Sequence, residues 1–188
     1  MLLTDLTGTA SIVFSSTALL LRLPLMASLS SARRIVLAGL IYVLLMMPFA
    51  GVSIIEFIRG MIGDLSITSL LLIVMTIRKP APSIKSETLL LITLSGCALY
   101  VLALGFSTFD LYRLGFGNLG VIVGLLIVAI LAWWRNNLVL AAGVSLAVIA
   151  WSIGYYESTN LWDYLLDPLL FIYALSAIIY RLLSRKIF

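Results

Sequence analysis

Long apolar runs separated by short polar stretches fill this sequence of 188 residues. Hydrophobic residues make up 63% of the chain and its mean hydropathy is +1.20, whereas soluble domains are about 45–50% apolar. A helix needs about 20 apolar residues to cross the hydrocarbon layer of a membrane. The pattern therefore predicts an all-α, polytopic transmembrane helix bundle, formed by residues 1–188 as a single transmembrane domain with no soluble domain.

Six or seven membrane spans fit these apolar runs, and seven is the number we expect. The expected spans are Thr9–Ser28, Ile35–Phe57, Leu65–Ile77, Thr88–Phe106, Leu119–Trp134, Leu138–Tyr155 and Leu161–Leu182. Arg22 and Pro24 interrupt the first span, so a shorter helix followed by an interfacial segment is an alternative there. Pro48 and Gly51 predict a kink in the second span.

The distribution of basic residues predicts an orientation. One expected side receives Arg33, Arg34, Arg78, Lys79, Lys85, Arg135, Arg181, Arg185 and Lys186, and the other receives only Arg59 and Arg113. Because Lys and Arg accumulate in cytoplasmic loops, we expect the C-terminus inside, the N-terminus outside, and a location in a bacterial inner (plasma) membrane. The same bias accounts for the net charge of +4 without a nucleic-acid partner.

Histidine is absent from the sequence, and Cys97 is the only cysteine. Ser/His proteolysis, haem ligation by histidine and HExxH zinc hydrolysis all require an imidazole, so this chain cannot carry them. An intramolecular disulfide is excluded as well. We therefore expect no metal site, no cofactor and no catalytic residue.

Charged residues on the expected outer side are the candidates for a functional site. Glu56 and Arg59 are spaced i, i+3, as are Asp110 and Arg113, so each pair can share a helical face. Two interpretations stay open: the pairs neutralise each other, or the arginines bind an anionic lipid phosphate while nearby carboxylates hold a hard cation or act as acid and base. The candidate headgroup-binding or partner-binding residues are Glu56, Arg59, Asp64, Ser66, Asp110, Arg113, Glu157, Asp163 and Asp167.

Asp167, which precedes Pro168, has its own alternatives. It is either a functional acid at membrane depth or a residue that caps amides freed by a kink at Pro168.

Aromatic and glycine patterns favour structural roles. Two aromatic belts at membrane interfaces are predicted, one from Tyr155, Tyr156, Trp162 and Tyr164 and the other from Trp133 and Trp134. The GxGxxG pattern of Gly115, Gly117 and Gly120 leads into an expected helix and lacks the preceding strand that a dinucleotide site requires. Gly120 with Gly124, and Gly143 with Ala147, predict closely packed helix faces.

The segment from Arg59 to Ser66, RGMIGDLS, carries a resemblance to a known family. It resembles a segment in the membrane half of the lipoteichoic-acid-synthase-like, sulfatase-fold phosphoglycerol and phosphoethanolamine transferases. The resemblance implies a membrane subunit that anchors or feeds a separate extracytoplasmic transferase. It also implies that Arg59, Asp64 and Ser66 order that interface.

Together these patterns predict a non-catalytic integral membrane component of cell-envelope lipid or glycan metabolism. Its acidic and aromatic outer rim would contact a lipid headgroup or an extracytoplasmic partner. The alternative is a small transporter or channel in which Asp167, Glu56 and Asp64 line a polar path, and a third hypothesis is a lipid-modifying enzyme that uses the outer carboxylates. The expected partners are membrane lipids and either an extracytoplasmic protein or a second copy of the chain.

Overall fold

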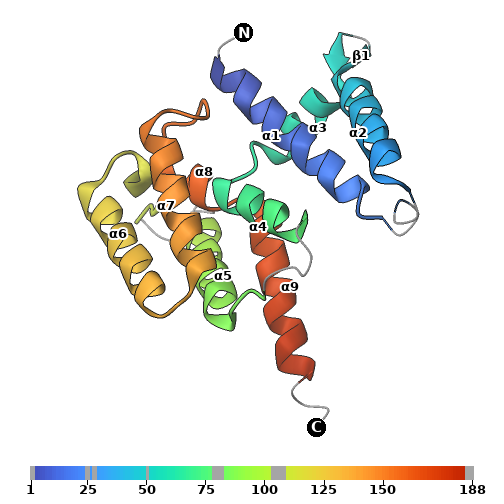
Figure 1. Ribbon diagram of the computed structural model, residues 1–188. Coiled ribbons are helices and arrows are strands. Elements are labelled where there is room, and N and C mark those ends of the chain that lie inside the picture. Colours follow the sequence, from blue (N-terminus) through green and yellow to red (C-terminus); the bar gives the residue numbers. More distant parts are fainter. Residues whose placement is uncertain are drawn as a thin grey trace.

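The computed structural model describes residues 3–23, 26, 29–49, 51–77, 83–102 and 109–184, and these are largely helical (Figure 1). In order, the elements are α1 (Leu3–Leu20), α2 (Ser31–Met46), β1 (Pro48–Phe49), β2 (Val52–Ser53), α3 (Ile54–Ile62), α4 (Ile67–Ile77), α5 (Ser86–Val101), the 3-10 turn η3 (Tyr112–Gly115), α6 (Leu119–Trp134), α7 (Leu138–Ser152), α8 (Leu161–Leu165) and α9 (Pro168–Ser184). The expectation of an all-α chain is confirmed for the described residues, apart from the short hairpin of β1 and β2, which have two residues each.

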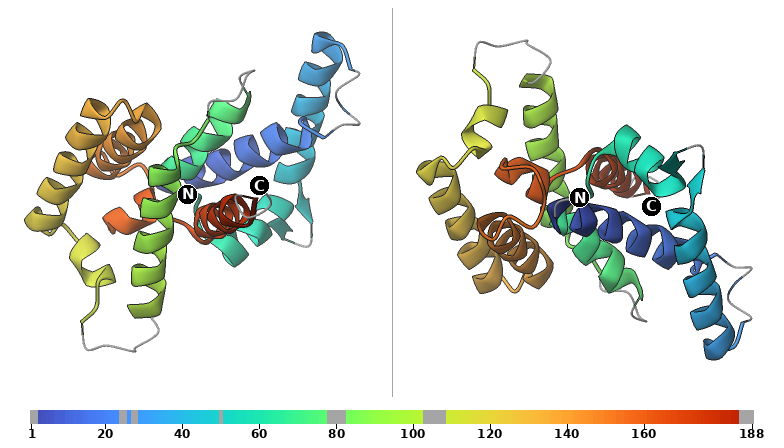
Figure 2. Two further views of the ribbon diagram at one scale, coloured as in Figure 1. Left: turned by 90° about the horizontal axis from the view of Figure 1, so that it is seen from below. Right: turned by 90° about the horizontal axis from the view of Figure 1, so that it is seen from above.

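The helices form two groups with separate apolar cores. In Figures 1 and 2, α1, α2 and α3 lie on one side, α5, α6 and α7 lie on the other, and α4 and α9 run between them. The smaller core contains Ile12, Val13, Ile55 and Leu65. The larger core lies among α4, α5, α7, α8 and α9 and includes Leu89, Ala147, Leu161, Tyr164 and Ala174.

Asparagines shape both ends of α6, including the tight hairpin that joins it to α7. Asn118 caps the start of α6 by accepting a hydrogen bond from the Val121 amide at 3.2 Å. Asn136 follows the helix at φ 53°, a left-handed conformation that asparagine tolerates better than most residues. The next amide, that of Asn137, then donates to the Ala132 carbonyl at 2.7 Å. The chain reverses there, and α7 packs against α6.

The second expected span does not form one helix. Helix α2 ends at Met46, and the chain turns through the hairpin that pairs Pro48 with Ser53. Gly51 occupies this turn at φ 91°, which suits a residue without a Cβ. Ser53 and Glu56 then form a capping box at the start of α3. The kink predicted from Pro48 and Gly51 is therefore a complete reversal of the chain.

Helix length overturns the predicted transmembrane bundle. Helix α6 has 16 residues and spans about 24 Å at about 1.5 Å per residue, which is shorter than the hydrocarbon layer of about 30 Å. Across the described ranges, no helix combines the length and the apolar character needed to cross a membrane. The seven spans, the N-out and C-in orientation, the transport role and the inner-membrane location were therefore wrong. Of the basic residues used for the orientation, Arg78, Lys79, Arg185 and Lys186 lie outside the described residues.

The two predicted small-residue faces behave differently. A Cβ on Gly124 would meet no atom within 4 Å, so no neighbouring backbone approaches α6 there. A Cβ on Gly143 would lie 3.4 Å from Thr68 Cγ2, and Ala147, one turn further, is fully buried. Close packing is therefore confirmed for α7 against α4, and the prediction for Gly120 and Gly124 was wrong.

Candidate functional site

A pocket of about 480 Å³, which we call the polar pocket for the three aspartates in its walls, brings together residues from six parts of the chain. Its walls are Ile62, Gly63, Asp64, Leu99, Tyr100, Tyr112, Tyr156, Ser158, Asp163, Leu166, Asp167 and Pro168. Three of these residues are aspartates and three are tyrosines. All three aspartates belong to the set predicted from the sequence, although Asp64 is about 100 residues away from the other two along the chain.

Asp167 is the most deeply buried acid in the pocket, with 3% of its surface exposed. One oxygen, Oδ2, accepts hydrogen bonds from the Ser66 amide at 2.9 Å, from the Ser66 hydroxyl at 2.7 Å and from the Ser69 hydroxyl. The other, Oδ1, accepts from the Leu170 amide at 2.8 Å and so caps α9. Four donors thus stabilise this carboxylate. Of the two alternatives for Asp167, the structure shows capping, but Pro168 is the first residue of α9 and not a position within a longer helix.

Asp163 faces a different set of donors. The Tyr112 hydroxyl donates to both carboxylate oxygens, at 3.2 and 3.0 Å, and the Ser158 hydroxyl donates to Oδ2. Asn160 holds these groups together, because its side-chain amide donates to the Tyr112 carbonyl at 2.9 Å. Asp163 has no ion-pair partner within the described part of the chain. Its negative charge is therefore met only by neutral hydroxyl groups.

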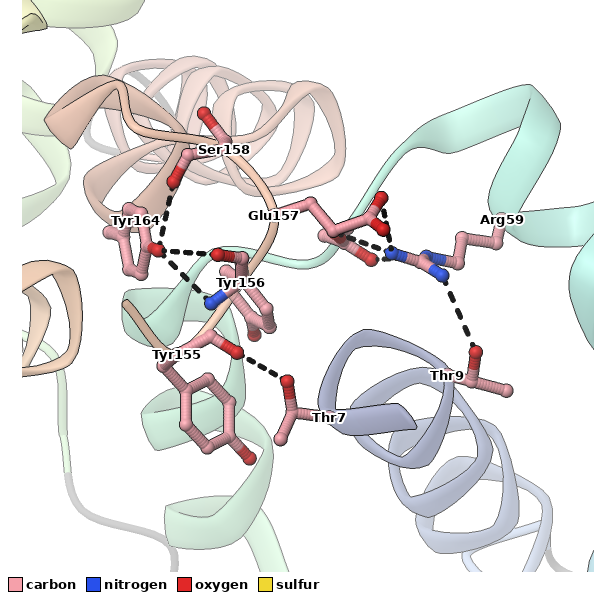
Figure 3. Close-up of polar contacts among 9 residues, drawn as sticks. Thr7, Thr9, Arg59, Tyr155, Tyr156, Glu157, Ser158 and Tyr164 are labelled. Atoms are coloured by element: carbon pink, nitrogen blue, oxygen red, sulfur yellow. Dashed lines mark hydrogen bonds and ion pairs between the residues drawn. The ribbon is translucent and has the colours of Figure 1, made fainter. Parts of the chain in front are cut away.

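Arg59 joins the pocket edge to two other elements. Its Nε lies 2.6 Å from Oδ1 of Asp64 and its Nη2 lies 3.1 Å from Oδ2, so the pair is bidentate. Nη2 is also 3.8 Å from Oε2 of Glu157, and Nη1 is 3.5 Å from the Thr9 hydroxyl (Figure 3). The guanidinium thus connects α3 with α1 and with the segment 155–160 between α7 and α8. A second contact crosses the same boundary, from the Thr7 hydroxyl to the Tyr155 carbonyl.

Two tyrosines at this site, Tyr156 and Tyr164, are core residues. Tyr156 and Tyr164 are both buried, and their ring centroids are 5.2 Å apart. The Tyr156 hydroxyl donates to the Leu65 carbonyl at 2.7 Å, and the Tyr164 hydroxyl donates to the Ser158 carbonyl at 3.0 Å. Figure 3 shows Tyr164 bonded to the backbone of the same segment. The predicted aromatic belt was wrong here, and Trp133 and Trp134 of the second belt are simply exposed.

Burial and nearby carboxylates keep the pocket tyrosines protonated. Burial raises the pKa of Tyr100 to about 12, with further contributions from Asp167 and Asp163. Burial also raises the pKa of Tyr112 to about 12, and Asp163 adds to the effect. Tyr156 is raised by burial as well, so its pKa lies above the ordinary tyrosine value. These hydroxyls remain neutral hydrogen-bond donors at physiological pH.

Some predicted residues lie away from the pocket. The Glu56 carboxylate accepts from the Ser53 amide at 2.7 Å and belongs to the cap of α3. Asp110 accepts from the Tyr112 amide at 2.9 Å and fixes the start of η3. Arg113 is exposed, and Arg59 forms ion pairs with the carboxylates of Asp64 and Glu157. The continuous outer rim and the pair of arginines on one anion, both predicted from the sequence, are therefore not formed.

The remaining predicted residues are brought together. Arg59, Asp64 and Glu157 form one ionic cluster. Asp163 and Asp167 line the pocket beside this cluster. Ser66 donates a hydrogen bond to Asp167. The sequence analysis missed Tyr100, Tyr112 and Ser158, since nothing in their spacing marks them. Gly115 was correctly assigned a structural role: a Cβ there would lie 1.8 Å from Asn160 Oδ1, so only glycine allows η3 to approach Asn160.

The described residues include no group of three acidic or cysteine side chains placed to hold a metal ion. Asp64, Asp163 and Asp167 share the pocket walls, but each is bonded to different partners. Comparison with protein-family models, curated proteins and solved structures finds no match to this chain. The chemistry of the pocket is therefore the basis for a functional proposal.

Proposed function

We propose that this protein is a non-catalytic binding component whose pocket receives the ammonium group of an organic cation, such as the headgroup of a cell-envelope lipid. The single observation that carries the proposal is the placement of Asp163 in a tyrosine-lined pocket where no described residue supplies a cation to it. A pocket of about 480 Å³ falls within the range of about 300–1,000 Å³ that small-molecule sites occupy.

The charges of the three aspartates differ in how they are balanced. Asp64 is neutralised by Arg59, and Asp167 is stabilised by four donors that include two backbone amides. Asp163 accepts hydrogen bonds only from hydroxyl groups among the residues that the structure describes. A ligand cation therefore gains most by approaching Asp163, because that carboxylate is partly desolvated and has no opposing charge.

The aromatic rings support a cation of low hydration. Tyr100, Tyr112 and Tyr156 line the same pocket, and aromatic faces attract ammonium and quaternary ammonium groups. The Tyr100 hydroxyl makes no hydrogen bond to any other described residue. It is therefore available to a polar group on the ligand. Residues 59–66 resemble a segment of phosphoglycerol and phosphoethanolamine transferases, and of these two headgroups phosphoethanolamine carries the ammonium group proposed here.

Choline and its neutral isostere 3,3-dimethylbutan-1-ol provide the test. We expect choline to bind the purified full-length chain in calorimetry and the isostere to bind at least ten-fold more weakly, because only choline carries a charge for Asp163. Asp163→Asn should weaken choline binding by at least about five-fold, because a quaternary ammonium makes no hydrogen bond and its charge attraction to a carboxylate at about 4 Å is worth about 1 kcal/mol even in water.

The matched control is Glu87→Gln, which removes one carboxylate from an exposed ion pair with Arg135 at the start of α5. It should leave choline binding unchanged. Equal binding of choline and the isostere, or equal losses in the two variants, would contradict the proposal.

A further inference from the structure

An apolar cavity of about 140 Å³ lies beside the polar pocket. Leucine, isoleucine and valine side chains from α4, α5, α6 and α7 form most of its walls. Few polar residues line it. The hydroxyl of one of them, Thr88, donates a hydrogen bond to Asn137 Oδ1 at 3.0 Å. A cavity of about 150 Å³ lined by apolar side chains binds benzene, so a hollow of about 140 Å³ has room for about six carbon atoms.

The apolar cavity and the polar pocket share a wall. Leu166 lines both of them. In the same short stretch of chain, Trp162 and Leu165 line the cavity, whereas Asp163 and Asp167 line the pocket. Helix α5 shows the same division, because Ser95 lines the cavity and Tyr100, further along the helix, lines the pocket. The two hollows therefore lie on either side of Leu166, between α5 and α8.

We propose that the ligand is an amphiphile, with its ammonium group in the polar pocket and a hydrocarbon chain of up to about six carbons in the apolar cavity. The proposal rests on the proposed function, since it names the ligand of the same site. The chain enters past Leu166, and transfer of each methylene group out of water supplies binding free energy. Ligands with shorter chains leave the cavity partly empty.

A series of n-alkyl-trimethylammonium ions tests the proposal, starting from tetramethylammonium. Affinity for the full-length protein should rise about four-fold with each added methylene, the fold-change that corresponds to about 0.8 kcal/mol. The rise should stop at about six carbons, where the cavity is full. The fluorescence of Trp162 offers a second readout, because this residue lines the cavity.

A cavity-filling variant and its control separate this site from other apolar surfaces. Ser95→Leu places a larger side chain in the cavity and should remove the dependence on chain length, while tetramethylammonium binding stays unchanged. Ser95→Ala removes the hydroxyl without filling the cavity, so the dependence should persist. If Ser95→Leu does not fold, Gly143→Ala adds one carbon at ordinary contact distance from Thr68 and should shorten the longest accepted chain by about one methylene.

The outcomes distinguish the two proposals. If tetramethylammonium binds and the series is flat, the amphiphile proposal fails and the proposed function stands. If the chain-length dependence survives in Ser95→Leu, the chain binds elsewhere and the amphiphile proposal fails. If neither tetramethylammonium nor choline binds, the proposed function fails, and the amphiphile proposal fails with it.

Discussion

Arg59 and Asp64 lie five residues apart and meet in a bidentate ion pair, with Nε 2.6 Å from Oδ1 and Nη2 3.1 Å from Oδ2. Their side chains are 15% and 17% exposed, so water screens the pair less than it would screen a surface pair. The pair spans the turn after α3 and places Asp64 at the edge of the polar pocket. Its integrity therefore determines how α3 and the start of α4 meet.

Replacing Arg59 should destabilise the fold. Arg59→Ala leaves Asp64 without its cation, and we expect the free energy of unfolding to fall by about 2 kcal/mol, below the 3–5 kcal/mol of fully buried pairs. Urea denaturation measures the change. Arg113→Ala is the matched control, because Arg113 is exposed and its loss should cost less than about 0.5 kcal/mol. Equal effects of the two substitutions would show that the pair contributes nothing.

Gly8 should resist any side chain. A Cβ there would lie 2.4 Å from Asp64 Oδ1 and 2.8 Å from Arg59 Nη2, so the ion pair must shift. Gly8→Ala should therefore cost about 1–3 kcal/mol of stability. Gly124→Ala is the control, because it meets no atom within 4 Å and should stabilise α6 by up to about 1 kcal/mol.

A double-mutant cycle makes the Gly8 prediction specific. In the Arg59→Ala background the added methyl group has lost one of its two neighbours, so Gly8→Ala should cost less there. Strict additivity in thermal unfolding would argue against a shared contact.

Asp167 should be the most sensitive acid in the chain. The carboxylate of Asp167 accepts four hydrogen bonds. Asp167→Asn replaces one of its oxygens by an NH₂ group, which cannot accept from the donors that face it. We expect a loss of at least about 2 kcal/mol, since hydrogen bonds to charged groups contribute about 1.5–3 kcal/mol. Asp110→Asn, which affects a single bond to the Tyr112 amide, should cost less than about 1 kcal/mol. Similar losses in denaturant titrations would refute this ranking.

Alkaline pH should weaken the fold through Tyr100 and Tyr112. Burial raises the pKa of each from 10.0 to about 12, so above pH 10 the unfolded chain releases these protons while the folded chain keeps them. The stability that this difference supplies is fully present below pH 10 and is lost as the pH rises through 12. Tyr112→Phe should flatten the fall in stability between pH 10 and 12. Superimposable pH profiles of variant and parent would exclude this contribution.

The sequence allowed the helical class and part of the site to be predicted, for identifiable reasons. Apolar periodicity indicates buried helices, but it does not tell whether lipid or protein surrounds them, so it predicts one span from Ile35 to Phe57. Pro48 and Gly51 were the available signals for the reversal that divides it. Asp163 and Asp167 were found because charge is scarce in this chain. Their donors Tyr112 and Ser66 come from distant segments, and only the fold brings them close.

The hydrogen bonds that Asp167 receives impose an order on assembly. Ser66 and Ser69 belong to the first half of the polypeptide, yet the carboxylate that accepts from them is made roughly one hundred residues later. During synthesis, the beginning of α4 must wait for that acceptor until the ribosome has passed residue 167. The N-terminal half therefore docks late. Fragments that stop before residue 167 lack the carboxylate that completes this contact.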